Sequence, residues 1–474
     1  PYDCNIRQWY LCWLNPFAPT AAAPLTARDQ NGYGALRILS YDEVGSIKWI
    51  SRNEQNNRFK AHDYYRYDYT IAAGESATIR FVLRKDSTEG AKSYTDALCE
   101  MTAFWQNVQS QVRLLPNAEG KLTENMFRQN ITVMLQMMQR YENSVDPDMI
   151  FARQGDVGRF IWIWEAVHFL TLLDRVGLSA YVTDAYRMFF KLWQKQDGDE
   201  KGRLDNPYVR WDNTNGSCLA GLSYHLMTVN DPALFAEFHD KMNLALQYIQ
   251  YRRSLATDKE VKGLFSSGQA SDWGEIGQPW TYTDAVNAYG LGIMAKCYEQ
   301  FDAPDAREIR EIYTEYHNIL MDIQDTFAKE HHGEHAYNMP HILGVPFEDS
   351  YNHCFYTDGA PYLLLLDIMD PHSELFEQME NFYRETGFLD DEHGLSAIMT
   401  NDACGADGLY GHVYYTGVAE PCWIHAWMER GETEKADKYA NGILRYGVTP
   451  EFMVSERYSS VDPWFTPWQP NASG

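Results

Sequence analysis

The spacing of apolar residues changes near residue 93 and divides the chain into two stretches of different character. From Ser93 onward, apolar side chains recur every three or four positions, which is the period of an amphipathic helix. Residues that break helices separate the periodic segments, so each segment is predicted to be a separate helix. The predicted helices span residues 93–113, 122–142, 157–176, 179–196, 213–228, 232–254, 280–300, 302–328, 355–369, 372–386, 416–430 and 432–446.

Before this point the chain has the short alternating runs that are typical of half-buried strands. Residues 68–84 alternate around an Ala-Gly-Glu turn and predict a β-hairpin, while residues 35–39 and 46–50 are short and β-prone. We interpret residues 1–88 as a β-sandwich that is incomplete and lacks its opening strands. Residues 89–118 are then a linker helix, and residues 119–474 are a helical domain.

The connections between the predicted helices alternate in length. Short turns such as Gly177–Ser179 and Asp302–Pro304 join the members of each pair, whereas long aromatic-rich loops precede the helices that begin near 157, 213, 280, 355 and 416. Because antiparallel hairpins place their short turns at one end, the long loops gather at the other. The predicted fold class is therefore mainly α: an (α/α)6 toroid of helical hairpins, preceded by a partial β-sandwich domain and a linker helix.

The predicted ring is one helix short. A toroid of six hairpins needs twelve helices, and eleven follow the linker. The sequence stops at Pro470–Gly474, where the last inner helix would begin, so we expect a missing C-terminal segment or a second chain that completes the toroid. The alternative is an α-solenoid used for protein binding, but solenoid repeats have short and uniform loops.

Composition narrows the function of this helical domain. The formal net charge of −26 argues against nucleic acid and against a membrane surface, because both need clustered Lys and Arg. No apolar run is long enough for a membrane span. The 14 Trp and 32 Tyr exceed the usual needs of a core, and flat rings with a polar edge suit the stacking of sugars. The predicted partner is a carbohydrate substrate.

No metal and no cofactor is predicted. Eight cysteines are scattered without a C-x-x-C pair, so they form neither a zinc site nor a dense disulfide framework. His331, His332 and His335 have ligand-like spacing but no matching ligand set, and Asp197–Glu200 is explained as an acidic turn. G-x-S-x-G, P-loop and G-x-G-x-x-G motifs are absent. The cysteines leave the compartment open, and we favour a periplasmic or extracellular location over a cytoplasmic one.

Carboxylates in the third long loop are candidates for acid catalysis. Glycoside hydrolysis needs one carboxylic acid that stays protonated and one carboxylate that stays ionised. Asp272 and Glu275 flank Trp273 among further apolar groups, a setting that raises the pKa of a carboxyl group. A turn cap and a solvated charge are the plainer explanations for these two residues.

A second candidate lies near the end of the chain. Glu456 stands between Ser455 and Arg457, where a hydroxyl and a cation favour the ionised carboxylate. A solvated loop charge is the plainer explanation here as well. For Asp212 and Asp358, which lie at or near predicted helix starts, helix N-capping is the default explanation.

The layout resembles that of the six-hairpin glycosidases, the group of trehalases, processing α-glucosidases, glucoamylases and α-L-rhamnosidases. Residues 160–169 resemble the aromatic-Trp-acid stretch that opens an inner helix in trehalases and processing glucosidases. Residues 267–273, followed by Glu275 and Trp280, are similar in position to the loop that bears the general acid. Residues 453–458 resemble the Val-Glu-Lys-Tyr stretch of trehalases, whose Glu is the catalytic base.

The resemblance implies an O-glycosyl hydrolase that cleaves an oligo- or polysaccharide with inversion, by single displacement. Asp272 or Glu275 would protonate the glycosidic oxygen, and Glu456 would activate a water. The Asp-Trp-Gly-Glu order of residues 272–275 differs from both the trehalase-like and the glucoamylase-like pattern, so the acid stays open, with Glu275 favoured. The implied sugar-binding residues are Trp162, Trp164, Trp211, Trp273, Trp280, Trp464, Arg159, Arg210, Asp212 and Asp358.

Three other functions stay open. A glycoside phosphorylase on the same scaffold would need inorganic phosphate and no base. A toroidal polysaccharide lyase would abstract a proton from a uronate, with Tyr351, His353, His412 and Tyr414 as candidate groups. A non-enzymatic helical-repeat protein would bind another protein and no small sugar.

Overall fold

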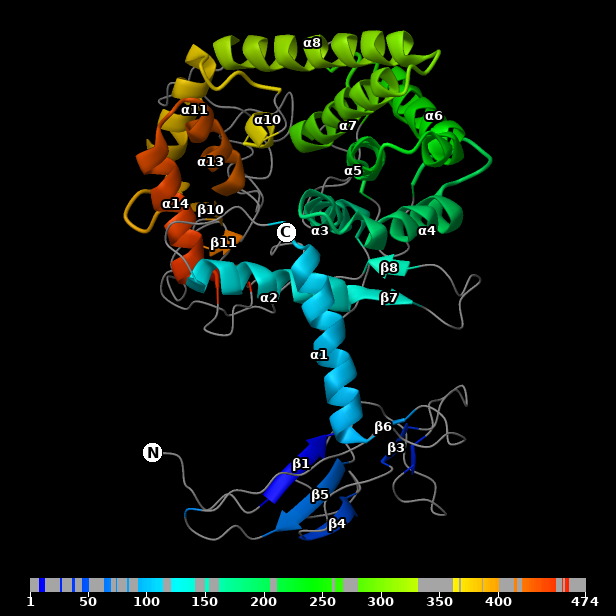
Figure 1. Cartoon of the computed structure of the whole chain (residues 1–474). Coiled ribbons are helices and arrows are strands. Elements are labelled where there is room, and N and C mark those ends of the chain that lie inside the picture. The colour runs from blue at the N-terminus through cyan, green and yellow to red at the C-terminus, as the bar shows by residue number, and fades with distance from the viewer. Residues whose placement is uncertain are drawn as a thin grey trace. The chain divides into compact units, whose positions relative to one another are not determined.

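The structure is a computed structural model, shown in Figure 1. It describes residues 8–12, 26–27, 36–38, 45–50, 64–69, 74, 83–84, 93–113, 121–140, 150–152, 162–204, 211–257, 261–266, 280–330, 361–365, 368–385, 387–399, 413–415, 420–448, 454 and 457–459. The chain divides into two compact units, Pro1–Ser110 and Gln111–Gly474.

The first unit contains short antiparallel strands. β1 (Gln8–Cys12), β5 (Tyr64–Tyr69) and β4 (Gly45–Ile50) form one sheet in that order, and β2 (Thr26–Ala27), β3 (Leu36–Ile38) and β6 (Leu83–Arg84) form another. The strands predicted at 35–39 and 46–50 are confirmed. The hairpin predicted over 68–84 is wrong, because the described strands in and beside this range do not pair with each other. β5 pairs with β1 and β4, whereas β6 pairs with β3. The alternation of apolar and polar residues shows which face of a strand is buried, but it does not show which other strand it pairs with.

The linker helix is α1 (Tyr94–Gln111), within the predicted 93–113. Its start is explained by Ser93, whose hydroxyl accepts a hydrogen bond from the Asp96 backbone N–H at 3.1 Å and donates to the Asp96 carboxylate at 2.8 Å. A serine that satisfies the first free N–H groups is a common way to begin a helix.

The second unit is mainly helical, which confirms the predicted fold class at that level, and each of the eleven predicted segments after the linker contains a helix. The helices are α2 (Lys121–Met137), α3 (Ile163–Arg175), α4 (Thr183–Trp193), α5 (Thr214–Val229), α6 (Pro232–Ser254), α7 (Thr281–Gln300), α8 (Ala306–Glu330), α10 (Tyr362–Leu365), α11 (Glu374–Glu385), α13 (Glu420–Glu429) and α14 (Thr433–Tyr446), with a 3₁₀ turn η1 (Ser179–Tyr181) before α4.

The second unit also contains strands that the helical periodicity did not predict. β7 (Met138–Arg140) and β8 (Ile150–Ala152) form a small hairpin. β9 (Leu389–Asp390), β10 (Leu395–Met399), β11 (Val413–Tyr415) and β12 (Arg457–Ser459) form a sheet in the order β12-β11-β10-β9. This sheet contacts the start of α13, where the Ser396 backbone N–H donates to the Glu420 carboxylate at 3.3 Å.

The helices form an inner and an outer layer. The inner helices contact one another in chain order, α3 with α5, α5 with α7, α7 with α10 and α10 with α13, as Figure 1 shows. α5 and α7 are buried on nearly every side, which is expected only of a helix with neighbours all round. α6, α8 and α14 each pack against the inner helix that precedes them. These contacts define an arc of helical hairpins, and its closure into a six-hairpin toroid stays a prediction.

Glycine allows α5 and α7 to approach closely. A Cβ atom at Gly216 would lie 2.4 Å from the Asn287 Cα, and one at Gly290 would lie 2.2 Å from the Gly216 carbonyl oxygen. The Asn287 side chain spans the same contact and accepts the Gly216 N–H at 2.9 Å. Both glycines are therefore needed for the spacing of the inner layer.

The short turns lie at one end of the hairpins. Between α5 and α6, Asn230 adopts the left-handed conformation with φ 54°, and the Asp231 carboxylate accepts the Ala233 N–H at 2.8 Å. Asp302, after α7, is also left-handed with φ 50°. Because the paired helices are antiparallel, the N-termini of α3, α5, α7, α10 and α13 face the opposite end, where the long loops precede them.

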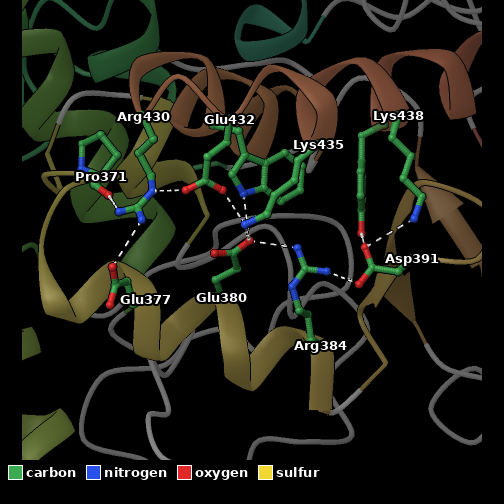
Figure 2. A network of polar contacts seen from close by, with 11 residues as sticks. Pro371, Glu377, Glu380, Arg384, Asp391, Arg430, Glu432, Lys435 and Lys438 are labelled. Carbon is green, nitrogen blue, oxygen red and sulfur yellow. Dashed lines mark hydrogen bonds and ion pairs between the residues drawn. The ribbon is translucent and has the colours of Figure 1, made fainter.

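An ion-pair network holds α11 against α13 and α14 (Figure 2). One carboxylate oxygen of Glu380 accepts hydrogen bonds from Arg384 at 2.8 Å, from Lys435 at 2.9 Å and from the Trp427 indole N–H at 2.9 Å. Glu380 is buried. A buried carboxylate with several charged and polar partners is costly to remove, because those partners lose their acceptor.

Replacing Glu380 by Ala is therefore expected to lower the free energy of unfolding by about 3 kcal/mol. Glu377 is a matched control, since it lies on the same helix and pairs with Arg430 but its side chain is 60% exposed. Its replacement by Ala is expected to cost less than about 1 kcal/mol. Urea unfolding of both variants measures the difference, and equal losses would contradict the importance of the network.

Candidate active site

The first turns of three inner helices bring their aromatic residues into contact. Trp164 of α3 lies 5.4 Å from Tyr282 of α7 and 5.8 Å from Tyr362 of α10, between ring centroids, and the two tyrosine rings are 4.8 Å apart. His168, one turn further along α3, packs on Trp164 at 4.3 Å. We call Trp164, His168, Tyr282 and Tyr362 the aromatic cluster. Along the arc, α5 and α7 separate α3 from α10, so this contact requires the arc to curve, with the cluster on its concave side.

The aromatic cluster is uncharged at neutral pH. Burial lowers the pKa of His168 to about 4, so its imidazole is neutral at pH 7. Trp164 and His168 are nevertheless partly exposed to solvent, whereas Tyr282 and Tyr362 are buried. Partly exposed rings surrounded by protein form an apolar surface that a ligand can reach.

A second pair of rings precedes the first two inner helices. Trp162, directly before α3, stacks on Trp211, three positions before the first residue of α5, with ring centroids 6.4 Å apart and an angle of 23°. The Trp211 indole N–H is buried and has no hydrogen-bond partner among the described residues. An N–H in that state is available to an acceptor such as a sugar hydroxyl.

Carboxylates are buried at the same ends of the inner helices. Glu165 lies in the first turn of α3, Asp212 precedes α5, Asp284 lies in the first turn of α7, and Glu420 is the first residue of α13. Helix N-termini stabilise negative charge, which helps to explain carboxylates at these positions. The end of the second unit where the long loops lie therefore combines aromatic rings with acidic groups.

Asp212 does not cap α5, although capping was its default explanation. The N-cap residue of α5 is Asn213, and its side chain makes no capping hydrogen bond. Asn213 is fully buried, and neither its amide nitrogen nor its amide oxygen has a hydrogen-bond partner among the described residues. The Asp212 backbone carbonyl accepts from the Asn287 amide at 3.1 Å, which ties the start of α5 to α7.

The third long loop is held at both ends. At its start, Arg253 donates to the Gly263 carbonyl at 2.6 Å, and the Phe265 N–H donates to the Asp284 carboxylate at 2.7 Å. At its end, Trp280 is buried as the N-cap residue of α7. The loop that contains the candidate acids thus leaves and rejoins the helical scaffold at anchored positions.

Asp284 is a buried carboxyl group with an unusual ionisation. The same carboxylate oxygen that accepts the Phe265 N–H also accepts the Tyr316 hydroxyl at 2.6 Å. Burial raises the pKa of Asp284 to about 7, and the two hydrogen bonds and the nearby charge of Arg253 offset part of that effect. Asp284 therefore takes up a proton near neutral pH in the folded state.

This pKa predicts a pH-dependent stability. The folded state keeps the Asp284 proton up to about pH 7, whereas the unfolded chain loses it near 3.8, so the group stabilises the fold at low pH and this stabilisation is lost as the pH rises toward 7. Asp284→Asn keeps an acceptor for Phe265 and Tyr316 and removes the titration. The wild type is expected to lose stability between pH 4 and pH 8 and the variant is not. The free energy of unfolding of the variant minus that of the wild type is therefore expected to increase over this range by on the order of 3 kcal/mol.

Urea unfolding at a series of pH values measures this change. Asp302→Asn, in an exposed turn at the other end of α7, is the control and is expected to follow the wild-type profile. A parallel pH profile for Asp284→Asn and the wild type would show that Asp284 does not titrate in this range.

The structure describes only part of the predicted site. Trp162, Trp164, Trp211, Asp212 and Trp280 lie together at the N-terminal ends of α3, α5 and α7. The remaining predicted site residues lie outside the described residues: Asp272, Glu275, Glu456, Arg159, Arg210, Trp273, Asp358 and Trp464.

Val454 and Arg457, two positions before and one position after Glu456, are described. Val454 forms a bridge with Val448, and Arg457 pairs with Tyr415 at the start of β12. β12 belongs to the sheet that contacts the first residue of α13. The segment that contains the candidate base is thus joined to the end of the second unit where the inner helices begin.

Several residues of the site were missed by the sequence analysis. His168, Tyr282, Tyr362 and Asn213 were not among the predicted residues, although each lies in or next to the first turns of a predicted inner helix. Their position in those turns was the available signal. The part that the sequence could not show is that rings from α3, α7 and α10 meet.

Metal ligands do not gather in the part of the chain that the structure describes. In that part of the chain, Cys99, Cys218 and Cys297 are free thiols. A search of the described helices finds none with the length and apolar character of a bilayer span.

Comparison with known proteins identifies the fold. No family model matches the chain, and no curated protein matches it. Among solved structures, a glycosidase variant in complex with glucose has a TM-score of 0.52 at 11% identity, over 74% of this chain and 93% of that chain. A Streptococcus pneumoniae structure from a family of metal-independent alpha mannosidases has a TM-score of 0.50 at 9% identity, over 81% of this chain and 96% of that chain. The chain shares the helical fold of these glycoside hydrolases.

Proposed function

We propose that the chain is an O-glycosyl hydrolase that cleaves an oligo- or polysaccharide. The observation that carries the proposal is the meeting of Trp164, Tyr282 and Tyr362 at the N-terminal ends of three inner helices. Aromatic surfaces with nearby polar groups are typical of sugar sites. Glycosidases use the same fold, and the buried carboxylates at this end supply the polar groups.

The proposed mechanism is inversion by two carboxyl groups. Glu275 or Asp272 gives a proton to the glycosidic oxygen, and Glu456 removes a proton from the attacking water on the opposite face of the sugar. The anchored ends of the third loop support the first assignment, since a general acid must be held at a constant position. The pairing of Arg457 in β12 supports the second for the same reason.

The proposed sugar-binding surface combines the described and the predicted tryptophans. Trp162 and Trp211 offer a stacked pair, and Trp164 is the partly exposed face of the aromatic cluster. The neutral His168 adds no charge to this surface, which favours an uncharged sugar. Trp273 and Trp464 extend the surface in this proposal, Trp280 borders it from its buried position at the N-cap of α7, and Arg159, Arg210, Asp212 and Asp358 bind hydroxyl groups.

Hydrolysis of a panel of neutral and uronate-containing oligosaccharides tests the proposal. Reducing ends are expected to appear without added phosphate, and NMR of the first product is expected to show inverted anomeric configuration. A requirement for phosphate would identify a phosphorylase, and new ultraviolet absorbance from unsaturated products would identify a lyase. Absence of both turnover and sugar affinity would favour a helical-repeat binding protein.

A further inference from the structure

The C-terminal end of α6 contains an arginine whose contacts reach two of the long loops. The Arg252 side chain is only 13% exposed. Its Nε donates to the Ser266 hydroxyl at 2.9 Å, and its Nη2 donates to the Ser266 carbonyl at 3.2 Å. The Ser266 N–H in turn donates to the Arg252 carbonyl at 3.3 Å. Three hydrogen bonds thus fix the third loop, at the last described residue before the candidate acids, to one residue of α6.

The same guanidinium group also faces the second loop. Its Nη1 lies 3.6 Å from the Asp212 carboxylate and donates to the Tyr248 hydroxyl at 3.2 Å. The Phe265 ring lies below the guanidinium, 4.9 Å from its central carbon. Each guanidinium nitrogen therefore has a partner, and the partners belong to the second loop, to the third loop and to α6 itself.

We propose that Arg252 is a positioning residue that couples the second and third loops, holding the Asp212 carboxylate and the Ser266 backbone in one fixed arrangement. The inference rests on the proposed function, in which Asp212 binds a sugar hydroxyl and the third loop carries the general acid. Both acid candidates lie outside the described residues, so the role proposed for Arg252 runs through Ser266 and Asp212. It acts by setting where the loop leaves the scaffold, relative to the carboxylate that binds the sugar.

Lysine cannot replace arginine in this role. A planar guanidinium directs several N–H groups at fixed angles and stacks on a ring, whereas an ammonium is a point charge on a flexible stem. Arg252→Lys therefore keeps the charge beside Asp212 and loses the double contact with Ser266. Arg252→Gln loses both.

The test compares natural and activated substrates. A displaced general acid slows the cleavage of an alkyl leaving group, which needs protonation, more than that of a nitrophenyl leaving group, which does not. In Arg252→Lys, kcat for a natural oligosaccharide is expected to fall about 100-fold, and kcat for the nitrophenyl glycoside less than about 10-fold. KM is expected to change little. A purely structural role would lower both rates in parallel with the folded fraction, and that result would overturn the proposal.

Arg310→Gln is the matched control. Arg310 also makes two hydrogen bonds, to Glu299 at 2.8 Å each, and also lies over a ring, that of Tyr313, but it is on the outer helix α8 near the short turns. Its kinetics are expected to equal those of the wild type. An equal loss in Arg310→Gln and Arg252→Lys would overturn the proposal.

A second measurement does not depend on turnover. Hydrogen exchange of the peptide that contains Ser266 is expected to quicken in Arg252→Gln and also in Asp212→Asn, because the coupling reaches Ser266 through Arg252. Unchanged exchange in both variants would overturn the coupling even in an active enzyme. A wild-type protein that cleaves no glycoside would instead refute the proposed function, while the exchange result would still decide the coupling.

Discussion

Glu456→Gln is expected to reduce turnover about 1,000-fold or more while leaving the fold and sugar affinity unchanged. The amide has nearly the shape of the carboxylate, but it cannot accept the proton of the attacking water. In an inverting mechanism no other group replaces this proton acceptor, so the loss falls on kcat rather than on KM. Steady-state kinetics on the substrate found by the oligosaccharide panel measures it.

Glu451→Gln is the control for this variant. Glu451 lies five positions earlier in the same C-terminal segment and has no place in the proposed mechanism. Its variant is expected to turn over at the wild-type rate, and calorimetric titration with the sugar is expected to give the same affinity for all three proteins. Turnover near the wild-type rate in Glu456→Gln would refute its assignment as the base.

Glu275→Gln is expected to cause the second large loss, about 100-fold or more in kcat on natural oligosaccharides. A leaving group that departs as a stable anion needs no protonation, so a nitrophenyl glycoside or a glycosyl fluoride is expected to lose less than about 10-fold. The ratio of the two losses, from rates measured side by side, marks the general acid independently of any effect on binding.

Asp272→Asn provides the comparison within the same loop. A smaller loss that is equal for both kinds of substrate is expected, because Asp272 would then affect only binding or loop structure. The opposite pattern would assign the acid to Asp272. A loss that does not depend on the leaving group in both variants would place the general acid outside the third loop.

The helices were predictable from the sequence because their signals are local. The turns at Asn230 and Asp302 and the breaks between apolar segments depend on residues close together in the chain, so the predicted ranges match α5, α6 and α7 closely. The match is poorer elsewhere: the range 355–369 contains only the short α10, and the range 122–142 is wrong at its end, where β7 forms a strand. The strands β9 to β12 were not predictable in the same way. Each has five residues or fewer. β9 pairs with the nearby β10, but β12 pairs with β11, from which α13 and α14 separate it in the chain.

The candidate site also has a part that the local sequence predicts and a part that depends on tertiary contacts. The residue types pointed to sugars and carboxylates, and they placed Trp162, Trp164, Trp211 and Asp212 near helix starts without any knowledge of contacts. The unusual ionisation of Asp284 depends on its burial, because an exposed aspartate would have a pKa near 3.8, whereas the pKa of the buried Asp284 is about 7. Nothing in the local pattern distinguishes Asp284 from an ordinary residue of a helical first turn.

The sequence by itself determined the helical hairpins, the side on which their long loops lie and the kind of chemistry those loops carry, since these follow from periodicity, turn residues and composition. Only the tertiary structure decided that Trp164 meets Tyr282 and Tyr362, and that Arg252 reaches both Asp212 and Ser266. The reason is physical. Each of these contacts joins residues on different elements, and the distance between them depends on how the helices and the loop ends pack.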